Sequence, residues 1–129
     1  MSSGIQMREA HFPGRAPIDA YGNGGFRFAE MSHKGSIMCL PSGVHGWEPK
    51  DAPLLAVDDL KLILEQANDI EILLVGTGVD LRRIPAEVRE LLRAHNISSD
   101  PMSTGAAVRT YNVLLAEDRA VAAALIAVE

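Results

Sequence analysis

The stretch Gly76-Thr77-Gly78 has residue types that could bind a phosphate group. It follows Ile70–Val75, a nearly all-apolar run that is typical of a strand covered on both faces. In open α/β sheets, ligands collect at the carboxyl ends of the strands, where backbone N–H groups and helix N-termini converge. However, the stretch lacks the third glycine of a dinucleotide fingerprint and the Gly-Lys-Ser/Thr ending of a P-loop. A tight turn is therefore favoured over a phosphate loop.

A second candidate is the start of an expected helix at Ser103 and Thr104. Their hydroxyls can accept hydrogen bonds from the unpaired N–H groups of a first helical turn, and Gly105 allows a close approach of another group. An anion site at this helix end could also recruit nearby arginines, namely Arg82, Arg83 or Arg109. Capping alone explains the two hydroxyls, so capping and packing are favoured and the anion site remains an alternative.

Three further side chains could line one groove: Trp47, the only tryptophan, and the neighbours Tyr111 and Asn112. The competing interpretation is that Trp47 covers the hydrophobic core and that Asn112 binds a loop carbonyl. The structural interpretation is favoured.

No residue is identified as catalytic. Cys39, the only cysteine, lies in an apolar strand, where a thiol behaves as an inert hydrophobe. The four histidines are His11, His33, His45 and His95. They have neither the helical spacing nor the cysteine partners that are typical of a zinc site. No Gly-x-Ser-x-Gly elbow occurs. We therefore expect no metal and no cofactor, and favour a non-enzymatic role.

Length and charge exclude several classes of protein. The 129 residues suit one domain, and 12 Lys and Arg against 17 Asp and Glu give a net charge of −5. There is no basic stripe for nucleic acid, no apolar run of 18 residues and no signal-peptide pattern. A single cysteine favours a reducing compartment. These features predict a soluble, cytoplasmic protein without a transmembrane segment.

Short strands are expected in the first third of the chain. Residues 1–17 are interpreted as a loosely held arm without a periodic element before Ile18. Strands at 18–21, 26–31 and 36–40, separated by glycine-rich turns, predict an antiparallel meander. Pro41-Ser42-Gly43 is expected to end this pairing, and Trp47 to lie in a loop.

Helices and strands alternate in the rest of the chain. Periodicity predicts the following elements in order: a helix from Asp58 or Asp59 to Asn68, a strand at 70–75, a helix from Pro85 to His95-Asn96, an extended piece at 97–100, a helix capped by Ser103 or Thr104, and a strand at 121–128. This order predicts one α/β domain over 18–129, a three-layer sandwich with a largely parallel sheet. The Gly76 and Ser103 corners should then share one rim.

Residues 72–78, 104–119 and 122–126 carry a family resemblance. They are similar to the uncharacterised family with the MTH-like fold, to which the third assembly factor of mitochondrial complex I (NADH:ubiquinone oxidoreductase) belongs. The resemblance implies a central mixed sheet of five strands, one antiparallel to the rest, with an accessory β layer. It also implies a role in binding other proteins, with no established catalysis. Val108 stands where many relatives carry cysteine, which argues against a thiol mechanism.

The leading functional hypothesis is a non-enzymatic interaction module that assists assembly of a respiratory NADH dehydrogenase or another protein complex. Its partner would be a protein of unknown identity. The expected contact groove comprises Gly76, Thr77, Gly78, Arg82, Ser103, Thr104, Tyr111, Asn112 and Trp47. The alternative is a binder of an anionic metabolite, or an undescribed enzyme, at the same sheet edge. A homo-oligomer formed through the front meander is a third possibility.

Overall fold

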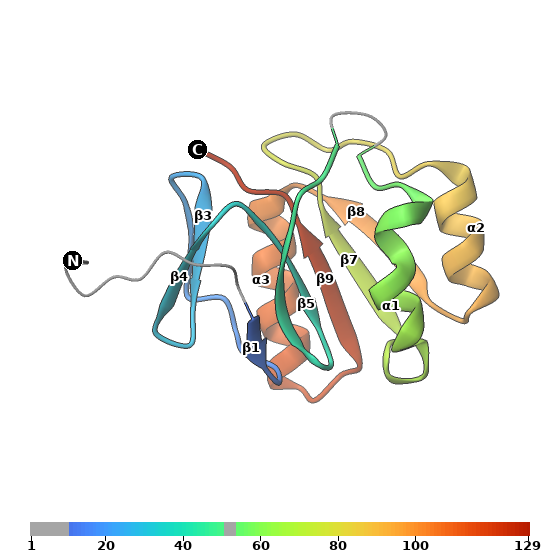
Figure 1. Ribbon diagram of the computed structural model, residues 1–129, viewed down its shortest axis with the longest axis horizontal. Helices are drawn as coiled ribbons and strands as arrows, with labels where there is room; N and C mark the ends of the chain where they lie inside the picture. Colours follow the sequence, from blue (N-terminus) through green and yellow to red (C-terminus); the bar gives the residue numbers. More distant parts are fainter. Residues whose placement is uncertain (1–10, 51–53) are drawn as a thin grey trace.

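The computed structural model describes residues 11–50 and 54–129, which form two sheets and three α-helices (Figure 1). The central sheet has six strands, in the spatial order β1 (His11–Pro13), β6 (Gly43–Trp47), β5 (Ser36–Leu40), β9 (Val121–Leu125), β7 (Ile72–Gly76) and β8 (Ser98–Met102). An accessory antiparallel sheet contains β2 (Ala20–Gly22), β3 (Gly25–Phe28) and β4 (Met31–Lys34). The helices are α1 (Lys61–Glu65), α2 (Ala86–Ala94) and α3 (Thr104–Ala116), with short 3-10 turns at Val57–Leu60 and Ala67–Asp69.

The central sheet is mixed, as the family resemblance implies. Strands β7, β8 and β9 are parallel, whereas β5 is antiparallel to both β9 and β6. Among the five strands from β6 to β8, β5 alone therefore runs against the others. The three-residue strand β1 adds a sixth position at the edge, antiparallel to β6.

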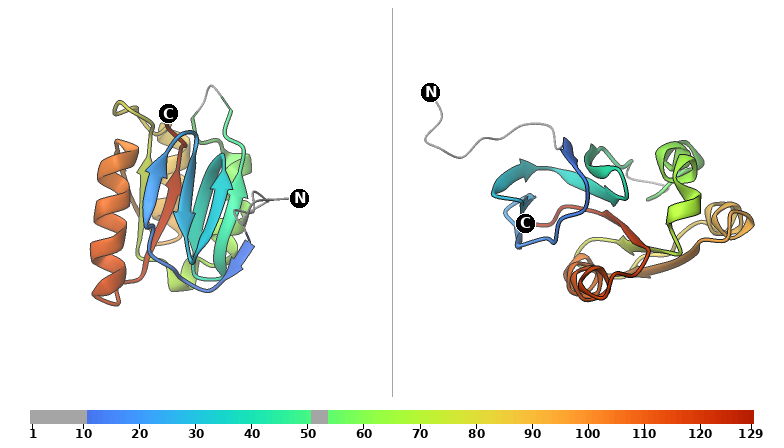
Figure 2. Two further views of the ribbon diagram at one scale, coloured as in Figure 1. Left: turned by 90° about the vertical axis from the view of Figure 1, so that its left-hand side faces the viewer. Right: turned by 90° about the horizontal axis from the view of Figure 1, so that it is seen from below.

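Alternating side chains of the central strands fill two cores. Leu73 and Val75 of β7 pack with residues of α1 and α2, whereas Leu74 packs on the opposite face with Val108 and Tyr111 of α3. Figure 2 (right) shows α3 on one side of the sheet and α1 on the other. Burial on both faces explains the nearly continuous apolar sequences of these strands. The three-layer arrangement expected from the sequence is confirmed.

The accessory sheet covers the same side of the central sheet as α3. Phe26 and Phe28 of β3 are buried in the core that also contains Ile37 and Tyr111. Strand β5, which the sequence places in this meander, instead belongs to the central sheet. All five of its residues are buried, because it is covered on both faces.

Strand β6 corrects the expectation that Pro41-Ser42-Gly43 ends the pairing and that Trp47 lies in a loop. Gly43–Trp47 form a hairpin with β5, in which Trp47 pairs with Ser36 and Gly43 with Leu40. Gly43 has φ +145°, and a Cβ there would collide with the Phe12 carbonyl. This glycine therefore lets β1 lie close against β6.

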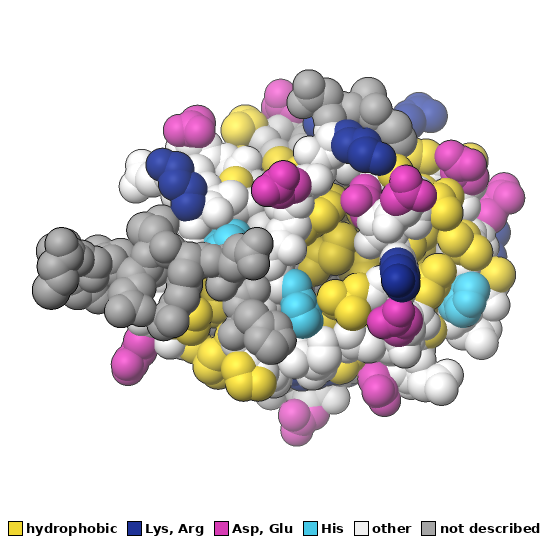
Figure 3. Space-filling model, in the orientation of Figure 1, with side chains coloured by type: hydrophobic (Ala, Val, Ile, Leu, Met, Phe, Trp, Pro, Cys, Tyr) yellow, Lys and Arg dark blue, Asp and Glu magenta, His cyan; other side chains and the backbone are white. Residues whose placement is uncertain are grey.

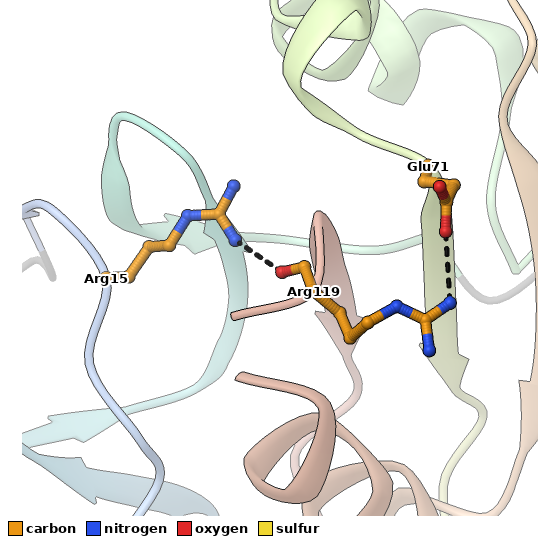
Figure 4. A network of polar contacts seen from close by, with 3 residues as sticks. All are labelled: Arg15, Glu71 and Arg119. Carbon is orange, nitrogen blue, oxygen red and sulfur yellow. Dashed lines mark hydrogen bonds and ion pairs between the residues drawn. The ribbon is translucent and has the colours of Figure 1, made fainter. Parts of the chain in front are cut away.

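Part of the expected N-terminal arm is ordered against the domain. Residues 1–10 of that arm lie outside the described residues, but His11–Pro13 form β1, and Ala16 is buried. The guanidinium of Arg15 donates hydrogen bonds to three backbone carbonyls, those of Arg119 (3.3 Å), Val121 (3.2 Å) and Asp69 (3.4 Å). Figure 4 shows the first of these, together with the contact between Arg119 and Glu71. Because β1 forms, the expectation of no element before Ile18 is wrong. Contacts to backbone carbonyls carry no sequence signal, so this arrangement could not be recognised from residue types.

The helices begin close to where their capping residues predict. Pro85 immediately precedes α2, and the Ser103 hydroxyl accepts a hydrogen bond from Ala106 N in α3. The helical segment expected from Asp58 or Asp59 to Asn68 is divided between the two 3-10 turns and α1. In the part of the chain that the structure describes, no helix is both long and apolar enough to cross a membrane.

Candidate functional site

The Gly76 and Ser103 corners are neighbours at the carboxyl edge of β7 and β8. Gly78 and Thr104 are joined by two hydrogen bonds. Thr104 N donates to Gly78 O (2.8 Å), and Gly78 N donates to Thr104 Oγ1 (3.0 Å). The segments at residues 76–78 and 103–104, far apart in the sequence, therefore form one continuous rim.

Thr104 also connects this rim to the end of β9. Its hydroxyl donates to Ile126 O (2.7 Å), and the residue is fully buried. A Cβ on Gly76 would lie 3.0 Å from Thr104 Cα, so a larger residue would have to push the Thr104 backbone away and glycine favours this close packing. Thr104 and Gly76 thus hold the rim together and are not open to a ligand.

Thr77 shapes the loop that follows β7. Its hydroxyl lies 2.7 Å from Asp80 O and 3.1 Å from Met102 O, and it accepts a hydrogen bond from Arg82 N (3.1 Å). Thr77 N donates to Met102 O (2.8 Å). The backbone N–H groups of Thr77 and Gly78 both donate to other groups of the protein, so they are not available to bind a phosphate. The geometry supports the tight-turn interpretation.

A small pocket of about 240 Å³ opens beside this rim. It is lined by Tyr21, Gly78, Val79, Ser103, Gly105, Arg109 and Val128. Among the described residues, the guanidinium of Arg109 makes no hydrogen bond and no ion pair. The pocket thus combines apolar side chains with one available guanidinium.

Apolar side chains are exposed next to the pocket. Val79 is 77% exposed and Leu81 is 67% exposed, and both lie in the loop between β7 and α2. Tyr21 is 42% exposed and lies over the first turn of α3, where a Cβ on Gly105 would collide with its hydroxyl. Exposed apolar side chains gathered around a pocket are typical of a surface that contacts another protein.

Two of the predicted groove residues are structural. Tyr111 is 1% exposed in the core, and Asn112 binds the backbone of Ile18 through both ends of its amide, at 2.9 Å to Ile18 N and 2.8 Å to Ile18 O. The structure therefore does not bring either side chain to the rim. Asn112 instead attaches the segment before β2 to α3, in agreement with the structural interpretation of this residue. Arg82 lies in the rim loop, but it is not among the residues that line the pocket.

Trp47 lies away from the rim. It packs against the core on the α1 side of the central sheet and lines a separate hollow of about 400 Å³ with Met38, Leu62 and polar neighbours. Figure 3 shows hydrophobic side chains exposed in the middle of this face, among acidic side chains and a histidine. The indole Nε1 is buried and has no hydrogen-bond partner in the described part of the chain. A single groove containing both Trp47 and the rim is therefore not formed.

Cys39 is held in an unreactive state. The thiol is buried in the core, and burial raises its pKa to about 12 although a hydrogen bond with Tyr111 acts in the opposite direction. A thiol with such a pKa remains protonated at neutral pH and is a poor nucleophile. Within residues 11–50 and 54–129, no three His, Cys, Asp or Glu side chains are grouped so as to hold a metal ion.

Sequence reasoning named Arg109 as a possible anion-site residue but missed Tyr21 and Val79, which line the pocket beside the rim. Two exposed aliphatic residues, Val79 and Leu81, alternate with charged residues in a loop, and this pattern was the available signal. The position of Tyr21 depends on how the accessory sheet packs against α3, so it could not be inferred from residue spacing.

This architecture defines a mixed α/β domain of the Mth938-like kind. A solution structure from Bordetella pertussis described as a Mth938-like domain is 27% identical, with a TM-score of 0.68, over 87% of this chain and 85% of that chain. The model of the DUF498/DUF598 family, described as a protein of unknown function, matches residues 18–126, and the chain belongs to this family.

Several relatives are similar over most of the chain. A crystal structure described as an outer membrane protein from Bartonella henselae is 66% identical, with a TM-score of 0.88, and covers 92% of this chain and 100% of that chain. An uncharacterised Rhodobacter capsulatus protein is 38% identical over 92% of this chain and 90% of its own length. NADH dehydrogenase [ubiquinone] 1 alpha subcomplex assembly factor 3 of Mus musculus is 30% identical over 95% of this chain and 66% of its own length.

Proposed function

We propose that this protein is a non-enzymatic interaction module that assists the assembly of a respiratory NADH dehydrogenase or another protein complex. The observation that carries the proposal is the similarity to assembly factor 3, which extends over 95% of the chain for the mouse protein and 84% for that of Danio rerio. Since the chain spans 66% and 63% of these two relatives, the shared domain is the part to which the proposal applies.

The rim is the proposed contact surface. Val79 and Leu81 expose apolar area that a partner would bury, and Tyr21 and Arg109 beside them are residue types enriched at protein interfaces. The polar side chains of Thr77 and Thr104 are occupied by internal hydrogen bonds, which favours a structural role for them over a chemical one.

Deletion of the gene in a bacterium that carries it tests the proposal. The amount of assembled NADH dehydrogenase is measured on native gels by in-gel NADH oxidation, together with the other respiratory complexes. We expect a deficit in one assembled complex, with its subunits retained in smaller assemblies, and restoration when the intact chain is supplied. Unchanged levels of every complex in the deletion strain would contradict the assembly role.

The alternative function, a binder of an anionic metabolite, is favoured by one observation. The pocket of about 240 Å³ lies at the N-terminal turn of α3 and includes Arg109. This volume is below the roughly 300 to 1,000 Å³ of common ligand sites, which favours the interaction module. A thermal-shift screen of anionic metabolites separates the two functions. A ligand at 100 times its dissociation constant stabilises the fold by about 2.7 kcal/mol. A flat screen at such concentrations would exclude the metabolites tested.

A further inference from the structure

The outer face of the accessory sheet carries a second surface feature. The strand register places Tyr21, Phe26 and His33 on one face, and the exposures of Phe26 and His33, 3% and 8%, mark it as the inner face. The outer face is therefore formed by Ala20, Gly22, Gly25, Arg27, Ser32 and Lys34. These six residues line a hollow of about 350 Å³, to which Tyr21, Asn23, Phe26 and His33 also contribute. The backbone is accessible at the floor of the hollow because three of the six carry no side chain beyond a methyl group.

The hollow is a fixed part of the sheet. A Cβ on Gly25 would collide with the His33 carbonyl, so the close approach of β3 and β4 requires glycine at this position. Gly25 faces Gly22 across β2 and β3, which leaves the turn end of this face without side chains on these two strands. Figure 2 (left) looks onto these strands, and no described helix crosses in front of them. An extended segment of another chain can therefore approach the sheet closely.

The charged side chains around the hollow are cations. Within residues 11–50 and 54–129, Arg27 and Lys34 line it and no Asp or Glu does, although the chain has 17 acidic residues against 12 basic ones. Arg27 Nη1 donates to Ser32 Oγ (3.1 Å), which leaves its other N–H donors available. Among the described residues, neither cation forms an ion pair. The hollow is therefore locally positive on a protein whose net charge is −5.

Arg27 and Lys34 lie far enough apart for each to bind a separate anionic group. Arg27 pairs with Ser32 and Lys34 pairs with Gly25, so the two cations are diagonal neighbours, about 7 to 8 Å apart at their Cα atoms. Tyr21 lines both this hollow and the rim pocket, which contains Arg109. The hollow that contains Arg27 and Lys34 therefore adjoins the pocket that contains Arg109. At the edge of the hollow, the Glu129 carboxylate and the Lys34 side chain both lie beside Gly24, so Glu129 is the one acidic side chain placed near these cations among the described residues.

We propose that this hollow binds an extended acidic segment of a partner polypeptide, whose carboxylates contact Arg27 and Lys34. The inference rests on the proposed function, since it specifies the chemistry of the partner. A peptide is favoured over a single small anion because the cations are spread across two strands and the hollow is open along the sheet. Arginine supplies paired donors for one carboxylate, and lysine supplies a separate point charge for a second one.

A titration of the ¹⁵N-labelled protein with a hexaglutamate peptide tests this inference directly. We expect amide shifts concentrated at residues 20–34, a dissociation constant that rises with salt, and no binding of hexalysine. Replacing both cations, Arg27→Glu with Lys34→Glu, should weaken hexaglutamate binding by about tenfold or more. The matched control is Arg89→Glu with Arg93→Glu, which makes the same charge change at two exposed positions of α2 and should leave binding within about twofold.

The possible results separate this inference from the proposed function. Shifts spread over α2 as strongly as over β2–β4, no binding at millimolar peptide, or equal loss in both double variants would overturn the inference. Inorganic phosphate or a single-stranded oligonucleotide that shifts the same amides at lower concentration than hexaglutamate would also overturn it, because the site would then recognise phosphate. The two proposals can also fail separately. If hexaglutamate binds at the hollow but deletion of the gene leaves every respiratory complex intact, the acidic-segment site is supported and the assembly role is contradicted.

Discussion

Thr104 and Gly78 exchange two hydrogen bonds, from Thr104 N to Gly78 O and from Gly78 N to Thr104 Oγ1. The same hydroxyl donates to Ile126 O, so one buried side chain joins the loop after β7, the start of α3 and the end of β9. The rim is therefore a rigid support for the exposed side chains of Val79 and Leu81 that the adjoining loop carries.

Replacing Thr104 with valine should destabilise the fold, although the two side chains have the same shape. Thr104→Val retains the shape of the side chain but leaves Gly78 N and Ile126 O without their partner, at a cost of about 2 to 3 kcal/mol. Urea denaturation measures the change in the free energy of unfolding. The matched control, Thr110→Val on the same helix, should change stability by less than about 0.5 kcal/mol. Equal effects of the two substitutions would show that the Thr104 hydroxyl does not join the rim.

Gly105→Ala should fill part of the rim pocket without unfolding the protein. A Cβ at this position collides with the Tyr21 hydroxyl, which is the end of a partly exposed side chain and can be displaced. Alanine also favours a helix more than glycine does, by up to about 1 kcal/mol. We expect an unchanged or slightly raised melting temperature together with reduced recovery of the protein partner in co-purification. A loss of stability with normal partner recovery would contradict this account of Gly105 and Tyr21.

Arg15→Ala should release the segment before β2. The substitution removes three hydrogen bonds to backbone carbonyls, so Gly14 N, which donates to Ser42 O (3.1 Å), should exchange with solvent faster. Hydrogen exchange measured residue by residue shows this change. Arg119→Ala is the control, because it removes the exposed ion pair with Glu71 (3.1 Å) and retains the carbonyl that Arg15 contacts. Equal acceleration at Gly14 in both variants would argue against Arg15 as the attachment.

Stability should fall in alkaline solution because of the buried pair of Cys39 and Tyr111. Burial raises the pKa of Cys39 to about 12, above its ordinary value of 9.0, and burial also raises the pKa of Tyr111. Both groups ionise more easily in the unfolded chain. Their stabilising contribution is therefore complete below about pH 9 and is lost as the pH rises through the unfolded values toward the folded ones.

Each group contributes a slope of up to about 1.4 kcal/mol per pH unit in that range. Cys39→Ala should make the decline of unfolding free energy between pH 9 and 11 shallower by about that amount. Denaturant melts at a series of pH values provide the measurement. An unaltered slope in the Cys39→Ala variant would mean that the thiol is accessible to solvent.

The carboxyl-terminal half of the fold could be predicted from hydrophobic periodicity and caps. Buried strands such as Ile72–Gly76 are apolar throughout, and α2 and α3 begin at Pro85 and Ser103 with the expected chemistry. The continuous apolar sequence of β5 carried the same signal as β7. The sequence of β5 therefore indicates a strand covered on both faces, as in the central sheet. Its closeness in sequence to the front turns favours the meander instead, and this second signal led to the wrong assignment.

The remaining features depend on contacts between distant residues. Strand β6 contains two glycines, and β1 has three residues ending in proline, so neither shows a clear strand pattern. Asn112 bonds to Ile18, 94 positions away in the chain, and no local spacing indicates this contact. The sequence placed the Gly76 and Ser103 corners together correctly, because parallel strands end at one edge. The side chains that are exposed there depend on tertiary packing.

The most direct test of the central claim is the recovery of assembled NADH dehydrogenase in a deletion strain that carries rim variants. Val79→Asp with Leu81→Asp places charges on the proposed contact surface, whereas Val113→Asp changes an apolar residue on α3 that is 57% exposed and does not line the rim pocket. With all proteins shown to be folded by circular dichroism, native gels should show full assembly with the intact chain and with Val113→Asp, and a clear deficit with the double rim variant. Full assembly with the double rim variant would contradict the claim that this protein acts through its rim.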